Sequence, residues 1–165
     1  VLTKIKTFAP QITVVFTVSP VRHWKDTAHG NQLSKAILLL SVDQLVQKTP
    51  FANYFPAYEL VMDDLRDYRF YDRDMLHPNE EAVNYIWEKL KTFCFANDTL
   101  AYISQTQNIN KAINHRPLHA TAPSYAKFLL STLEKIKQIE ASFPQTDLSP
   151  DKALISKLLN QANSH

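Results

Sequence analysis

The sequence predicts an α/β fold, a partial three-layer α/β/α sandwich built on a parallel sheet, with a C-terminal helical appendage. Residues 12–18 are β-branched and apolar on both faces, which is typical of a strand covered by helices on both sides. The order strand, helix, strand, helix up to about residue 96 favours a parallel βαβ unit. From residue 97 onward only helical patterns occur, so we expect two parts, residues 1–96 and 97–165, the second packing on the first.

Composition excludes several classes of function. The 165 residues carry a net charge of +2, with basic side chains scattered among acidic ones, which indicates neither a nucleic-acid-binding nor a membrane-surface protein. No apolar run reaches the ~20 residues of a membrane span. The single cysteine excludes an internal disulfide, and the single glycine excludes a phosphate-binding glycine loop or dinucleotide fingerprint. We therefore expect no cofactor.

The elements follow from periodicity and from the positions of proline. In chain order, the predicted elements are a helix ending before Pro10, a strand at 12–18, a polar loop at 19–31, a helix at 31–48, a strand at 57–62, a charged loop at 66–78, and helices at 79–95, 98–114, 124–143 and 149–163. Two strands are too few to bury a parallel sheet. Because the chain opens at Val1 in mid-pattern, we expect either that neighbouring strands precede it in a longer protein or that a homo-oligomer forms through the exposed sheet edge.

The charged loop carries the strongest chemical signal, an Asp-x-x-His-Pro string formed by Asp74, His77 and Pro78. A carboxylate that accepts from one imidazole nitrogen leaves the other free to take a proton, which is how a general base is oriented. Pro78 suits the first position of a helix, which would place His77 at the N-cap. The alternative is that Asp74 is an ordinary loop or capping carboxylate.

The polar loop follows the carboxyl end of the first strand, where ligand crevices of open α/β sheets lie. Its candidate substrate-binding residues are Ser19, Arg22, His23, Asp26, His29 and Asn31. Arg22 and His23 either line a pocket for an anionic or hydroxylated group or brace the loop through ion pairs. Pro20 has no N–H to offer an oxyanion, so we expect Ser19 to fix the loop and not to act as a nucleophile.

No metal site is expected. His115 and His119 have the spacing of helical metal ligands, but Pro117 between them breaks the helix, and neither cysteine nor an acidic cluster completes the set.

Long ordered strings resemble the GSCFA domain family. They are Thr17-Val-Ser-Pro-Val-Arg-His-Trp-Lys-Asp, His29-Gly-Asn-Gln-Leu-Ser-Lys, Tyr54-Phe-Pro-Ala-Tyr-Glu, Arg66-Asp-Tyr-Arg-Phe-Tyr, Asp74-Met-Leu-His-Pro and Asn114-His-Arg-Pro. That family is similar to SGNH (GDSL-like) hydrolases, which use an α/β/α sandwich and a serine nucleophile. The resemblance implies His77 as base, Asp74 as its orienting acid, and residues 19–26 lining the same site.

One departure from the family pattern affects the expected activity. The Gly-Ser-Cys-Phe-Ala motif, which holds the presumed nucleophilic serine, does not occur in these residues, so the resemblance is to the C-terminal part of the domain, with the nucleophile expected upstream. We expect a serine esterase or acyl hydrolase acting on a small-molecule or carbohydrate ester, inactive as this chain alone. The alternative is a non-catalytic module that binds a carbohydrate, an acyl ligand or a protein. The compartment is left open, with the cytoplasm as a working expectation.

Overall fold

The chain forms two compact units, Val1–Cys94 and Phe95–His165. The computed structural model describes residues 1–119 and 122–163, apart from the side chains of Asp26 and Asn163. Each unit is described by itself. None of the helices in the described part of the chain is long and apolar enough to span a membrane.

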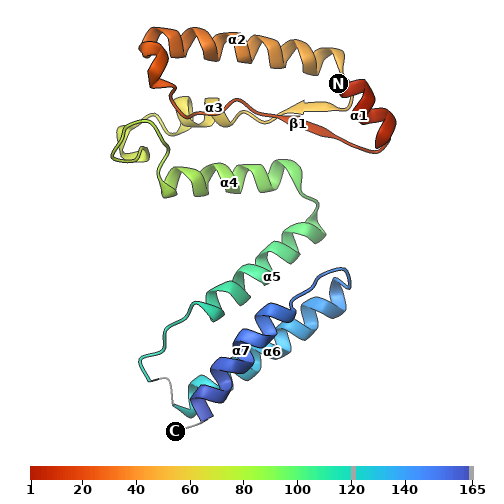
Figure 1. Ribbon diagram of the computed structural model, residues 1–165, viewed down its shortest axis with the longest axis vertical. Coiled ribbons are helices and arrows are strands. Elements are labelled where there is room, and N and C mark those ends of the chain that lie inside the picture. Colours follow the sequence, from red (N-terminus) through yellow and green to blue (C-terminus); the bar gives the residue numbers. More distant parts are fainter. Residues whose placement is uncertain (120–121, 164–165) are drawn as a thin grey trace. The chain divides into compact units, whose positions relative to one another are not determined.

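The first unit places a small parallel sheet among helices. Its elements are α1 (Leu2–Phe8), β1 (Val14–Phe16), η1 (Trp24–Asp26), α2 (Thr27–Lys48), β2 (Ala52–Tyr54), α3 (Ala57–Glu59), η2 (Leu60–Asp64), η3 (Tyr68–Phe70) and α4 (Glu80–Cys94). The two strands pair in parallel, with Val14 opposite Ala52 and Phe16 opposite Tyr54. Helix α2 is the crossover between them, and Figure 1 shows the strands between α2 and α4. The mixed α/β class and the parallel pairing are confirmed.

The second predicted strand, at residues 57–62, is wrong. The strand lies before Pro56, at Ala52–Tyr54, and residues 57–64 are helical, first as α3 and then as the π-helical turn η2. The physical reason is a spacing of four: Ala57, Val61 and Leu65 are 7%, 1% and 4% exposed, so they point to the same side of a helix. Val61 and Leu65 form a core cluster with Ala82 of α4.

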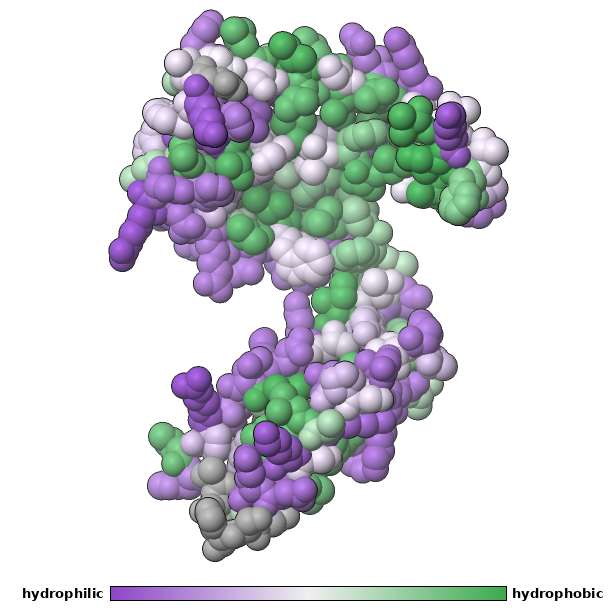
Figure 2. Space-filling model, in the orientation of Figure 1, coloured by the Kyte–Doolittle hydropathy of each residue, from purple (hydrophilic) through white to green (hydrophobic). Residues whose placement is uncertain are grey.

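Helix α2 is apolar on more than one face. Leu39 and Val42 are half-buried apolar residues of this helix. Three other apolar side chains of α2 are largely exposed: Leu33 at 53%, Ile37 at 64% and Leu40 at 64%. Figure 2 shows hydrophobic surface in the region of this helix. Helices of this kind are usually buried on all sides, which fits the expectation that two strands and their helices do not complete a sandwich.

The described part of the second unit consists of the helices α5 (Asn97–Ile113), α6 (Pro123–Ser142) and α7 (Ser149–Asn163). The predicted bounds are confirmed to within one residue. Pro123 occupies the first helical turn of α6, where a missing N–H costs no intrahelical hydrogen bond. The unit has its own core, in which Leu129, Ile136 and Ile155 are fully buried.

Candidate functional site

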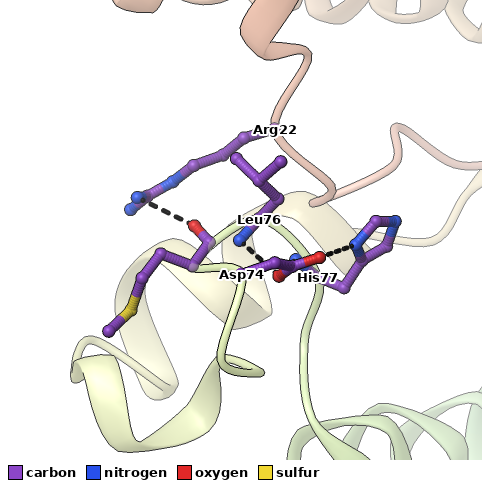
Figure 3. Close-up of polar contacts among 5 residues, drawn as sticks. Arg22, Asp74, Leu76 and His77 are labelled. Carbon is purple, nitrogen blue, oxygen red and sulfur yellow. Dashed lines mark hydrogen bonds and ion pairs between the residues drawn. The ribbon is translucent and has the colours of Figure 1, made fainter.

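Asp74 and His77 are joined in a tight turn between η3 and α4. Asp74 Oδ1 accepts hydrogen bonds from the backbone N–H groups of Leu76 at 2.9 Å and His77 at 3.0 Å. Its other oxygen, Oδ2, lies 2.6 Å from Nδ1 of His77. Figure 3 shows the imidazole turned toward this carboxylate. Between them, Met75 adopts a positive φ of 60°, a conformation that a non-glycine residue adopts at some cost in energy.

The electrostatics of this pair suit a proton acceptor. The hydrogen bond from the His77 side chain, followed by those from the two backbone N–H groups, lowers the pKa of Asp74 to about 2. Asp74 is therefore a carboxylate at neutral pH, and Nδ1 of His77 carries the proton that it donates. Nε2 is then the nitrogen with a free lone pair. The His77 side chain is 58% exposed.

Local hydrogen bonds fix the entry to α4. Tyr71 and Pro78 form an isolated antiparallel bridge, and the Asp72 N–H donates to the His77 carbonyl at 2.8 Å. Asn79 Oδ1 accepts from the Ala82 N–H, three residues on, as an N-cap side chain does. The prediction that His77 is the N-cap is therefore wrong. Asn79 takes the position because its side-chain oxygen accepts from the Ala82 N–H in the first turn of α4.

The polar loop after β1 reaches this turn from 53 residues away in sequence. The Arg22 backbone N–H donates to the Leu76 carbonyl, and Arg22 Nη1 donates to the Met75 carbonyl, both at 3.3 Å. In Figure 3, Arg22 approaches the turn from one side, and His77 lies on the other side of Asp74. The two polar loops predicted from sequence thus meet, although the second one does not follow a strand.

Two buried polar residues of α2 form hydrogen bonds with the polar loop. Asn31 and Lys35 are each 7% exposed. Asn31 Oδ1 accepts from the His23 N–H at 2.8 Å, and Lys35 Nζ donates to the Ser19 carbonyl at 2.6 Å. Burial lowers the pKa of Lys35. Sequence reasoning missed Lys35, although its position four residues after Asn31 places both on one face of the helix.

The remaining candidates are placed as follows. Ser19 Oγ accepts from the Val21 N–H at 3.2 Å, so the serine hydroxyl braces its own loop. The His23 side chain is exposed, and His29 is exposed in the first turns of α2. The side chain of Asp26, which was assigned to the same site, lies outside the described residues.

The described part of the chain holds no group of three or more His, Cys, Asp and Glu side chains that suits a metal ion. The stretch with His115 and His119 lies beyond the end of α5, in irregular backbone.

Comparison with known families gives two matches. The GSCFA family model matches residues 1–90, and the model for the GSCFA domain protein, C-terminal domain, matches residues 106–161. Neither a curated protein nor a solved structure matched the chain. The first family match includes every residue of the turn and of the polar loop that contacts it.

Proposed function

The chain belongs to the GSCFA family, and from this membership we propose that it supplies the general base of an SGNH-type serine ester hydrolase. In this proposal His77 is the base and Asp74 orients it. Arg22, His23 and Asn31 contribute to the wall of the substrate crevice. The nucleophile is the serine of the Gly-Ser-Cys-Phe-Ala motif, which does not occur in these 165 residues. The parallel pair β1 and β2 is then part of a larger three-layer sandwich.

The chemistry follows the pattern of serine esterases. Nε2 of His77 takes the proton of the serine hydroxyl while the serine oxygen bonds to the acyl carbon of the ester. The bond from that carbon to the alcohol oxygen breaks, and the alcohol leaves with the proton held by His77. Water, deprotonated by the same nitrogen, then bonds to the acyl carbon, the bond from that carbon to the serine oxygen breaks, the serine takes the proton from His77, and the acid is released. Asp74 stays ionised throughout and stabilises the imidazolium, which its low pKa favours.

The observation that carries this proposal is the 2.6 Å contact between Asp74 Oδ2 and His77 Nδ1. The same carboxylate is held by two backbone N–H groups through its other oxygen, so the orientation of the imidazole is set by the turn.

The test uses short-chain nitrophenyl esters and these residues within a polypeptide that carries the Gly-Ser-Cys-Phe-Ala segment. We expect turnover, loss of it in His77→Ala, and a fall in kcat/KM of about 10² to 10⁴-fold in Asp74→Asn. His115→Ala, which removes an imidazole from the second unit, is the matched control and should retain activity. The 165 residues alone should show no appreciable turnover. Retained turnover in His77→Ala would exclude His77 as the base.

A second candidate is a non-catalytic module that binds a carbohydrate, an acyl group or another protein. One observation favours it: the side chains of His77 and Asp74 are 58% and 45% exposed, whereas water-excluded sites strengthen catalytic electrostatics. In that case the longer polypeptide is inert toward a broad panel of acyl esters and acylated sugars. Saturable binding of an acylated sugar, lost on changes in the polar loop, would then identify the module.

A further inference from the structure

A small cavity of about 180 Å³ opens between the polar loop and the segment that follows α3. Its apolar part comes from Val61, Met62 and Leu65, of which Val61 and Leu65 are almost completely buried. Tyr68 and Tyr71 contribute aromatic rings. The cavity can therefore hold a small apolar or flat aromatic group away from water.

Arg22 provides the charge of this cavity. It is half-buried, and its guanidinium carbon lies 4.6 Å from the ring centroid of Tyr71 and 5.6 Å from that of Tyr68. Its guanidinium donates from Nη1 to the Met75 carbonyl at 3.3 Å. Within the described ranges, no carboxylate forms an ion pair with Arg22. A guanidinium has five N–H donors, so several of them are available to a ligand.

Arg66 and Asp67, which have opposite formal charges, also line the cavity. Arg66 pairs with Asp63 at 3.0 Å, and Asp67 accepts from the Arg69 N–H at 2.9 Å as the N-cap of η3. Among the described side chains that line the cavity, Arg22 is the cation for which no ion pair is found. Its guanidinium lies within cation–π distance of both tyrosine rings, which restricts the side chain before a ligand binds.

We propose that this cavity is a binding site for a small organic anion with an aromatic or short apolar body. The carboxylate of the ligand accepts from the free N–H groups of Arg22, in the planar paired geometry that guanidinium and carboxylate share. Its body lies against Tyr71 and the apolar floor. A neutral analogue of the same shape fills the floor but leaves the half-buried charge unpaired, and a cation is repelled. The site shares Arg22 with the proposed substrate crevice, but it needs neither His77 nor a nucleophile, so binding can be tested without hydrolysis.

The test is an NMR titration of the full 165-residue chain with benzoate and with benzyl alcohol, which share a ring and differ in charge. We expect benzoate to shift the signals of Val61, Leu65 and Tyr71 and to bind about tenfold or more tightly than benzyl alcohol, as expected for a charge-assisted hydrogen bond. Arg22→Gln should remove this preference. Arg116→Gln, which removes a guanidinium that does not line the cavity, should keep it.

A second measurement, on the wild-type chain, tests the charge interaction even if Arg22→Gln does not fold. In the wild-type chain, rising salt should weaken benzoate binding and leave benzyl alcohol binding almost unchanged, because salt screens the charge interaction. Equal affinity for the two probes at low salt, shifts that map elsewhere, or a preference that survives in a folded Arg22→Gln variant would each overturn the proposal.

Discussion

Asp74 Oδ2 lies 2.6 Å from Nδ1 of His77, while Asp74 Oδ1 receives the backbone N–H groups of Leu76 and of His77 itself. One carboxylate therefore fixes both the backbone and the ring of the same histidine. The orientation of the imidazole is decided within four residues of chain.

The first prediction concerns the ionisation of Asp74. Its pKa of about 2 is caused first by the hydrogen bond from His77, so His77→Ala should move the pKa toward the ordinary value of 3.8 for aspartate. Carbon-13 NMR titration of the Asp74 carboxyl group measures this directly. His29→Ala, which removes an exposed imidazole on α2, should leave the pKa unchanged. An unchanged pKa in His77→Ala would mean that the backbone donors alone hold the carboxylate.

The depressed pKa of Asp74 also sets how stability changes with pH. Because the folded-state pKa of Asp74 is depressed, its contribution to stability is present above about pH 4. It is lost as the pH falls through the folded value of about 2.

The second prediction concerns alkaline pH. Burial, followed by a hydrogen bond to Glu59, raises the pKa of Tyr54, whose hydroxyl lies 2.8 Å from Glu59 Oε2. The folded chain keeps this proton above about pH 10, where the unfolded chain loses it, so stability should fall as the pH rises further. Denaturant unfolding of Tyr54→Phe at several pH values should give a shallower fall. A slope equal to that of the wild type would contradict the assignment.

The third prediction concerns the core of the second unit. Ile136 is fully buried in the cluster that joins α6 to α7, so Ile136→Ala should lower the free energy of unfolding of this unit by about 2 to 5 kcal/mol. The neighbouring exposed residue, Lys135, offers a matched control. Lys135→Ala should change the free energy by about 0.5 kcal/mol or less. Similar losses in the two variants would mean that the burial of Ile136 is not what stabilises the unit.

The fourth prediction concerns self-association. The Val14 N–H donates to the Phe51 carbonyl, and the Phe16 carbonyl accepts from the Phe55 N–H, so the backbone groups of Val15 face the outer edge of β1. We expect a second copy to pair with this edge. Val15→Pro should then abolish the dimer in sedimentation, because proline has no N–H to donate. If Ile37→Lys on the exposed face of α2 abolishes it and Val15→Pro does not, the contact is made by the helix.

Sequence patterns determined the features that depend on neighbours along the chain. The first strand, predicted at 12–18 and observed at Val14–Phe16, the crossover helix and the three helices of the second unit follow from apolar period and proline position, which are local. The three-residue spacing of Asp74 and His77 is also local, so the sequence predicted their hydrogen bond. The second strand was misplaced because a short apolar run has no decisive period, and the spacing of Ala57, Val61 and Leu65 is visible only once burial is known.

Only the tertiary structure decided which distant segments meet. Arg22 and Met75 are 53 residues apart, and their contact depends on the parallel pairing of β1 with β2 and on the path of the loop before α4. Lys35 and Ser19 are joined for the same reason, because α2 follows the polar loop and contacts both η1 and β2. No sequence period encodes such contacts, since they arise when separate apolar surfaces are buried together. The sequence therefore did not predict that Tyr68 and Tyr71 lie beside Arg22.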